Sequence, residues 1–367
     1  MSWNGAIIKE KAREMSRTIT DLSHAIGVSR QTVDSWIKGQ IPRGQHLIKL
    51  CKELETSPSS FFTPEKEYLV SVPQHRTVRR KKVTDEMQAA SKEMAEQYIN
   101  LFRSAPSSSL VRVIRASRRD DENAKRLSAQ LRRLSGIDDD RPMDFEHAFY
   151  LLAELGIYTI FRPFPEETSK DIYAFYSKIC EQRVIFVNTD TNIIDFIFQL
   201  LHETIHAIRD EEPDKFNEVE EEDFCDSVAN YIQFPDEYVA TVSRAIEGCS
   251  EGVAVNKLKK FAMEHAHSLF GISKRLKQFD SAFSINVAGA DTNLKKVLPR
   301  VRDILFDKGD ARKYIETLCE LSPGFIDLVT KQSPNTSLRK LAEWLGLDNT
   351  LDAKEVMSEL RRIGEGS

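Results

Sequence analysis

Apolar residues recur at intervals of three and four along most of the chain, a spacing typical of amphipathic helices. In residues 1–62 the pattern is broken repeatedly, at Gly27 and Gly39 among other positions, so we expect several short helices there. Residues 241–367 keep the helical spacing almost throughout. Both ends of the chain are therefore predicted to be helical.

Short apolar runs with the character of β-strands occur between these ends, in residues 120–240. Two helical patterns precede them, and a long helical pattern that begins near Ile193 follows them. The three runs are Ile157–Phe161, Ile172–Tyr176 and Val184–Asn188. Helices beside a small three-stranded sheet predict an α+β domain, and the whole chain is expected to be α+β but predominantly α.

Residues 63–119 lose the regular pattern. They contain Pro73, a basic run at Arg79–Lys82 and a Pro- and Ser-rich stretch at Ala105–Ser109, with one predicted helix at Thr84–Phe102. We therefore expect a basic connector that holds one helix. The predicted domains are 1–62, the connector 63–119, a domain at 120–240 and a helical C-terminal region at 241–367.

The formal net charge of −5 hides two opposite local imbalances. From His75 to Ser135 the sequence holds 15 Lys and Arg against 7 Asp and Glu, whereas Asp210 to Asp223 holds nine acids and one base. The average charge is therefore uninformative about partners. Each run by itself also fits a solvated helix face or a linker.

The composition limits the class of protein. With 41% apolar and 30% charged residues, the 367-residue chain can bury more than one core. It has no run of 18 uncharged apolar residues, and Met1–Met15 lacks the apolar core of a secretory signal, so we expect a cytoplasmic protein with no membrane partner. The five cysteines form no CxxC motif, which suits reduced thiols. Any metal must therefore be held mostly by His and carboxylates.

The segment Thr18–Gly39 predicts two short helices joined by a tight turn at Gly27, with Thr18 and Ser29 suited to cap them. The inward faces are expected to hold Leu22, Ala25, Ile26, Val33, Trp36 and Ile37. On the outward face of the second helix, Arg and Gln can make paired hydrogen bonds to base edges in the major groove. The predicted DNA contacts are Arg30, Gln31, Thr32 and Ser35, with Ser29, Lys38 and Arg43 on the phosphate backbone.

This order of helices, followed by W-x-K-G at Trp36–Gly39 and by Leu47–Leu54 and Ser57–Phe61, resembles the Xre/Cro/C1 repressor family of DNA-binding domains. The resemblance implies that residues 1–62 bind DNA. One departure is Ile19, where family members often place a glutamine that contacts phosphate. The alternative is a module kept for protein contacts or for pairing two copies of the chain as a homodimer.

The helical pattern that begins near Ile193 contains His202-Glu203-x-x-His206. Two histidines four residues apart project from one face of a helix, at a separation that lets both imidazoles reach one tetrahedral Zn²⁺. Glu203 lies beside them, where its carboxylate can take a proton from water on the metal. The spacing therefore predicts a Zn²⁺ site with His202 and His206 as ligands and Glu203 as the general base.

Two histidines need a further protein ligand, and the acidic helical pattern that starts at Glu222 can supply it. Glu222 and Asp226 are one turn apart, so Glu222 can bind the metal while Asp226 accepts the second ring N–H of a ligand histidine. The sixteen residues from His206 to Glu222 are enough to leave one helix and enter another. Rival ligands are Glu218, Glu221 and Cys225.

The stretch from about Asn123 to Phe279 resembles the ImmA/IrrE family of metallo-endopeptidases, which are gluzincin-like. The resemblance is carried by the β-run that ends in Asn188, by L-L-H-E-T-I-H-A-I at Leu200–Ile208 and by E-x-x-C-D-x-x-A-N-x-x-x-x-P at Glu222–Pro235. It implies zinc ligands at His202, His206 and Glu222 and a general base at Glu203. The departures are Ile205, where Gly is common, and Ile232-Gln233-Phe234-Pro235 in place of L-L-M-P.

Together the two resemblances imply a regulatory zinc endopeptidase fused to a DNA-binding domain. They imply cleavage of an Xre-type repressor, or of this chain's own connector, in response to stress, DNA damage or mobile-element induction. One alternative is a DNA-binding transcription regulator that uses the zinc domain and helical tail as a sensor without cleavage. Another is an antitoxin-like or phage-defence regulator whose tail binds a partner protein. Candidates for the group that stabilises the oxyanion are Tyr173, Tyr176, Tyr231, His265 and His267.

Overall fold

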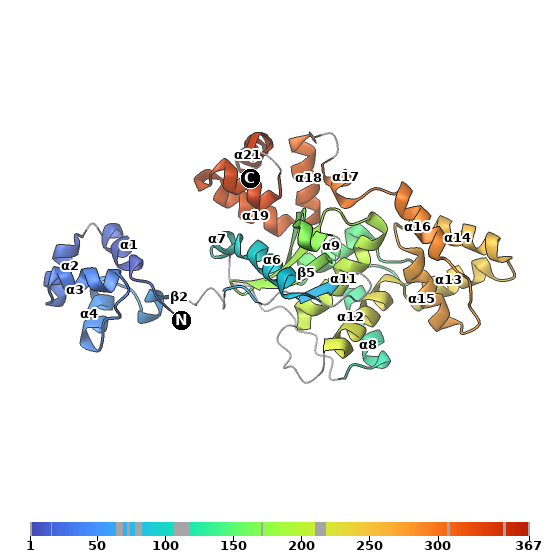
Figure 1. The fold of residues 1–367 in the computed structure, drawn as a ribbon, viewed down its shortest axis with the longest axis horizontal. Helices are drawn as coiled ribbons and strands as arrows, with labels where there is room; N and C mark the ends of the chain where they lie inside the picture. Colours follow the sequence, from blue (N-terminus) through green and yellow to red (C-terminus); the bar gives the residue numbers. More distant parts are fainter. Residues whose placement is uncertain are drawn as a thin grey trace. The chain divides into compact units, whose positions relative to one another are not determined.

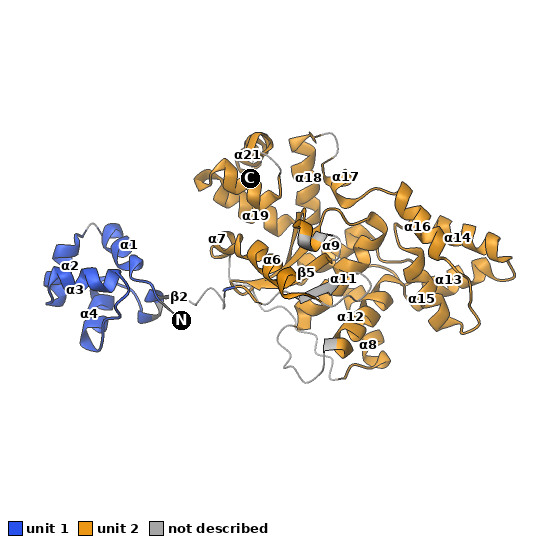
Figure 2. Ribbon diagram, in the orientation of Figure 1, with its two compact units in different colours: residues 1–69 blue, residues 70–367 orange. Residues whose placement is uncertain are grey.

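The structure is a computed structural model that describes residues 2–15, 17–63, 69–71, 74–77, 83–105, 118–169, 172–209, 218–306, 309–347 and 350–365. The chain forms two compact units, residues 1–69 and 70–367 (Figure 2). The predicted fold class is confirmed, since helices dominate and a small mixed sheet lies in the second unit (Figure 1). None of the described helices is both long and apolar enough to span a bilayer.

The first unit is a small helical bundle closed by a short sheet. Its elements are β1 (Ser2–Trp3), α1 (Ala6–Glu14), α2 (Ile19–Ile26), α3 (Arg30–Ile37), α4 (Gln45–Glu53), η1 (Pro58–Phe61) and β2 (Phe62–Thr63). Strand β1 pairs antiparallel with β2. The Trp3 indole N–H donates to the Trp36 carbonyl over 2.7 Å, and the Trp3 ring stacks on Phe61, so the strand pair is fixed against the end of α3.

Helices α2 and α3 are joined by the predicted tight turn. The Thr18 hydroxyl accepts from the Asp21 N–H at the start of α2, and Gly27 ends that helix with φ +82°, a value that favours glycine. The Ser29 hydroxyl caps α3. The prediction that Ala25 faces inward was wrong, because the buried stripe of α2 runs through Leu22, Ser23 and Ile26 and leaves Ala25 exposed.

The second unit is built around a four-stranded sheet. Its first elements are β3 (Gln74–Thr77), α6 (Asp85–Glu96), α7 (Ile99–Phe102), α8 (Asp121–Ser135), α9 (Phe145–Glu154), β4 (Ile157–Arg162), α10 (Glu166–Ser169), β5 (Ile172–Ile179), β6 (Gln182–Asn188), α11 (Ile193–Arg209) and α12 (Glu218–Gln233). The strand order is β3-β5-β6-β4, with β4 and β6 parallel and the other pairs antiparallel. The three predicted runs are β4, β5 and β6, and β3 adds an edge strand from the segment expected to be connector.

Helices cover both faces of this sheet. On one face Phe175 and Phe186 stack at 4.7 Å between ring centroids, and Tyr98, just before α7, contacts Phe186 edge-on at 5.4 Å. On the opposite face Phe161 of β4 packs against Phe196 of α11 at 6.0 Å. Helix α11 is thus held against the sheet by an aromatic core, which fixes the helix that carries the H-E-x-x-H motif.

Residues 83–105 of the predicted connector are packed into the second unit. Met94, Tyr98 and Phe102 are buried, and the Tyr98 hydroxyl donates to the Trp344 carbonyl over 2.9 Å. The basic run Arg79–Lys82 and residues 106–117 lie outside the described residues. The apolar spacing of α6 and α7 therefore marks a helical layer on the sheet.

The C-terminal region is helical, as predicted. Its elements are α13 (Asp236–Ile246), α14 (Glu251–Glu264), α15 (Leu269–Phe279), α16 (Ala288–Val297), α17 (Val301–Leu305), α18 (Ala311–Leu321), α19 (Pro323–Gln332), η4 (Ser333–Asn335), α20 (Leu338–Leu345) and α21 (Thr350–Glu365). Helices α13–α16 contact one another, and α18–α21 form a second group (Figure 1). Asn192, at the entrance to α11, donates to the carbonyls of Lys295 and Leu298, so the connection between the two groups is tied to the sheet.

Candidate metal centre

The two histidines of the H-E-x-x-H motif lie on the buried face of α11. His202 is 0% and His206 is 4% exposed, because α11 is enclosed by the sheet and by α12. The Nε2 atoms of the two rings are 3.1 Å apart. Two imidazole nitrogens at this separation are directed at one point, as a shared metal requires.

Glu222 of α12 brings a carboxylate to the same point. Its Oε1 is 3.0 Å from His206 Nε2, and its Oε2 is 3.3 Å from His202 Nε2. Tetrahedral ligands about 2.0–2.1 Å from zinc are roughly 3.4 Å from one another, so these three donors fit a zinc ion. The Glu222 side chain is 33% exposed, and the site therefore opens to solvent on the carboxylate's side.

Electrostatics keep this carboxylate in the form that binds a cation. Burial acts to raise the pKa of Glu222, but hydrogen bonds and positive charge from His202 and His206 outweigh burial and hold the pKa well below its ordinary value. Asp226, one turn further along α12, places its Oδ1 3.0 Å from His202 Nδ1. The structure thus brings together the three predicted ligands and the carboxylate predicted to orient one of them.

Glu221 and Cys225, the rival ligands, occupy a different side of His206. Their donor atoms and a His206 ring nitrogen lie within 4.8 Å of one another. However, Glu221 accepts from Arg209 over 2.8 Å and pairs with Arg119, and burial raises the pKa of the Cys225 thiol well above its ordinary value. The cluster with Glu221 and Cys225 contains only one of the two motif histidines, whereas the cluster with Glu222 contains both, so the set that includes Glu222 fits a shared zinc ion better. The side chain of Glu218 lies outside the described residues.

The Cys225 sulfur faces the ring nitrogen of His206 that is turned away from the three donors. Sγ is 3.7 Å from His206 Nδ1 and 3.7 Å from Glu221 Oε1, with the thiol donating to the carboxylate. Arg209 is 4% exposed and lies over the Phe224 ring. Neither Arg209 nor Arg119 was identified from the sequence. The feature that could have pointed to Arg209 is a basic residue at the end of an otherwise apolar helix.

Glu203 and the other candidate acids and bases lie in distinct places. Glu203 is fully buried on α11 next to His202. His267 is hydrogen-bonded to Tyr238 at 2.8 Å, and Tyr231 donates to Asp121.

The sheet separates two of the remaining candidates for the oxyanion-stabilising group. Phe161 pairs with Val187, and Val187 pairs with Ala174, so these residues share the sheet face that α11 covers. Tyr176, two residues after Ala174, is on that face, whereas Tyr173 is on the opposite face. His265 stacks on His267 in the helical region. Of these two tyrosines, Tyr176 is therefore the one on the side of the metal helix.

The predicted DNA contacts lie together on α3 and its flanks in the first unit. Arg30, Gln31, Lys38 and Arg43 are exposed, while Thr32 and Ser35 are half-buried. The Ser29 hydroxyl accepts from the Thr32 N–H, and the Ser35 hydroxyl donates to the Thr32 carbonyl, so both are engaged within α3. The long exposed side chains are therefore the ones that can reach a nucleic acid.

Two protein-family models match separate segments of the chain. Residues 8–67 match the family model of the Cro/C1-type HTH DNA-binding domain. Residues 152–245 match the peptidase M78 model, described as the IrrE N-terminal-like domain, and this range contains α11 and α12. Comparison with curated proteins and with solved structures found no match. The chain therefore joins a Cro/C1-type helix-turn-helix domain to an ImmA/IrrE-type metallopeptidase-like domain in one polypeptide.

Proposed function

We propose that this protein is a regulatory zinc-dependent endopeptidase that binds DNA through its first unit. The observation that supports the proposal best is the convergence of His202, His206 and Glu222, with donor atoms 3.0–3.3 Å apart, beside the buried carboxylate of Glu203. Three protein ligands leave one position of a tetrahedral zinc ion for water or substrate, the arrangement typical of catalytic sites.

Each residue of the site has a separate task in this proposal. Zn²⁺ would supply Lewis acidity that polarises a peptide carbonyl and activates water near neutral pH. Glu203 accepts a proton from the attacking water and passes it to the leaving amide nitrogen. Asp226, whose Oδ1 is 3.0 Å from His202 Nδ1, would accept the Nδ1–H and so leave the Nε2 lone pair of that histidine available to a metal.

The helix-turn-helix domain supports a substrate that is bound to DNA. We infer a substrate that is itself a DNA-bound, Xre-type repressor, cleaved in the cytoplasm under stress or DNA damage. The chain's own connector, 63–119, is the second substrate to examine, because it links the two functional units. A homodimer would present two recognition helices to a duplex.

Incubation with a repressor tests this proposal. Zinc-loaded wild-type protein and a Glu203→Gln variant are each mixed with an Xre-type repressor encoded beside this chain, with and without single-stranded DNA. Mass spectrometry then identifies the fragments. We expect cleavage by wild-type protein. The cleavage rate of Glu203→Gln should be lower by a factor of about 10² or more. Zinc content is measured in both proteins, so that a loss of metal is distinguished from a loss of the base.

The same samples decide between the substrates and the alternative function. Fragments that end within 63–119 in wild-type protein alone would identify the connector as a substrate. Equal processing by wild-type and Glu203→Gln protein would exclude this site as the peptidase. Intact repressor and intact chain under all conditions would instead favour a DNA-binding regulator that uses the metal site without turnover.

A further inference from the structure

A cavity of about 440 Å³ lies in the second unit, lined by none of the residues that converge on the metal. It opens at the carboxyl ends of β4 and β6, where Pro163 follows one strand and Thr189 and Asp190 follow the other. These strands are parallel neighbours. Crevices at the carboxyl ends of parallel strands are recurrent ligand sites, and the volume lies in the range of small-molecule pockets.

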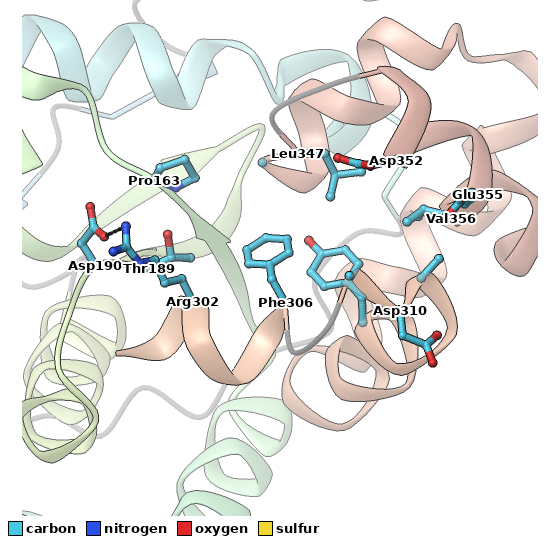
Figure 3. A pocket seen from close by; sticks show the side chains of 14 residues that line it. Pro163, Thr189, Asp190, Arg302, Phe306, Asp310, Leu347, Asp352, Glu355 and Val356 are labelled. Carbon is cyan, nitrogen blue, oxygen red and sulfur yellow. Dashed lines mark ion pairs between the residues drawn. The ribbon is translucent and has the colours of Figure 1, made fainter. Parts of the chain in front are cut away.

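The centre of this cavity is aromatic. The rings of Phe306 and Tyr314 stack with their centroids 4.8 Å apart and an interplanar angle of 17°. The Tyr314 hydroxyl is already used, because it donates to the Leu345 carbonyl over 2.7 Å, so Tyr314 offers its ring. Leu347 and Val356 add apolar surface (Figure 3). The centre therefore suits a flat apolar group.

The charges of the lining are unequal. Asp190 is paired with two arginines, because its Oδ1 is 2.7 Å from Arg302 Nη1 and 3.4 Å from Arg300 Nη1. Figure 3 shows the pair with Arg302 on one side of Phe306 and Asp310 and Glu355 on the other. Among the described carboxylates of the lining, Asp310 caps α18 by accepting from the N–H groups of Arg312 and Lys313, whereas Glu355 of α21 is exposed. The α21 side of the cavity therefore presents the negative charge of Glu355, and a cationic group is favoured there.

We propose that this cavity binds a small organic cation with a planar apolar body. The body lies against Phe306 and Tyr314, and the cationic group is directed at the carboxylate of Glu355. The turn that it contacts leads into α11: the Thr189 carbonyl accepts from the Arg302 N–H over 2.9 Å, and Asn192 follows three residues later. The site is thus next to the segment that begins the metal-binding helix.

Three isosteric probes test the proposal on the full-length chain, by isothermal titration and by ligand-observed NMR. They are benzamidine, which is cationic, benzamide, which is neutral, and benzoate, which is anionic. We expect benzamidine to bind with a Kd in the millimolar range, about tenfold tighter than benzoate, with benzamide between them. Phe306→Leu should weaken benzamidine and benzamide alike, since both lose the aromatic contact.

A matched pair of variants separates the site from general charge. Glu355 and Glu320 are both exposed, but only Glu355 lines the cavity. Glu355→Gln should weaken benzamidine about threefold or more and leave benzamide unchanged, whereas Glu320→Gln should leave both unchanged. Equal binding of benzamidine and benzoate, equal effects of the two variants, or no binding at about 10 mM would each overturn the proposal. None of these readouts depends on peptidase activity.

Discussion

Replacing Asp226 tests whether this carboxylate organises the metal centre. Its Oδ1 is 3.0 Å from Nδ1 of His202, and the two residues are 7% and 0% exposed, so water screens their interaction little. Carboxylates in this position commonly change metal affinity 10- to 100-fold, or about 1.4–2.7 kcal/mol. We expect Asp226→Ala near the upper end. Asp226→Asn keeps an acceptor but loses the charge, and should weaken zinc about tenfold.

The assay is a competition for zinc between the full-length chain and a chromophoric chelator at neutral pH. Circular dichroism of each apo-protein is used to check that the variant is folded. Asp223→Asn is the matched control, because Asp223 is exposed on the same helix and carries the same charge. It should bind zinc within about twofold of wild type. An Asp226→Ala protein that binds zinc as tightly as wild type would refute the assignment, and so would an equal loss in the Asp223→Asn control.

Three further predictions concern Cys225, His267 and Gly5. Cys225→Ala should weaken zinc about three- to tenfold in the same competition assay and Cys225→Ser should restore it, since Sγ faces His206 Nδ1; equal affinities of both variants would contradict this role. Burial lowers the pKa of His267 to about 3, below its value in the unfolded chain. The free energy of unfolding that this histidine contributes is therefore fully present above about pH 6.5 and is lost as the pH falls toward 3, by up to about 1.4 kcal/mol per pH unit. Urea unfolding at several pH values checks this, and an unchanged slope in His267→Gln would exclude His267 as the cause. Gly5→Ala would place Cβ 2.1 Å from the Trp36 carbonyl oxygen, so the first unit should lose about 3 kcal/mol or more in thermal unfolding; a wild-type Tm would contradict that contact.

The elements of the fold that could be predicted from the sequence are those with an apolar period of their own. Strands β4, β5 and β6 and helix α11 are found where the apolar patterns place them, because each is long enough to show its own period. Strand β3 has four residues and follows the Pro73 region, so no such period marks it. Its pairing with β5 depends on a neighbour about a hundred residues away.

The candidate metal site could likewise be predicted only in part from local patterns in the sequence. The separation of His202 and His206 is set by the helix repeat, and the sequence by itself therefore predicts two nitrogens on one face. The choice among Glu222, Glu221 and Cys225 depends on the rotation of α12 against α11, which no local pattern encodes. In the structure that rotation aims Glu222 at both Nε2 atoms and turns Glu221 toward Arg209.

The two functional modules could be predicted from the sequence by itself, because the capped helix-turn-helix and the H-E-x-x-H helix each consist of residues from one short segment of the chain. The sequence also favoured Glu222 over its rivals, and the tertiary structure places its carboxylate at both histidines. Tertiary structure alone decided that residues 83–105 belong to the second unit and that Phe306, Tyr314 and Glu355 line a cavity. The physical reason is range. Helix periods and caps act over a few residues, whereas packing brings together groups far apart in the chain through burial of apolar surface that no local pattern specifies.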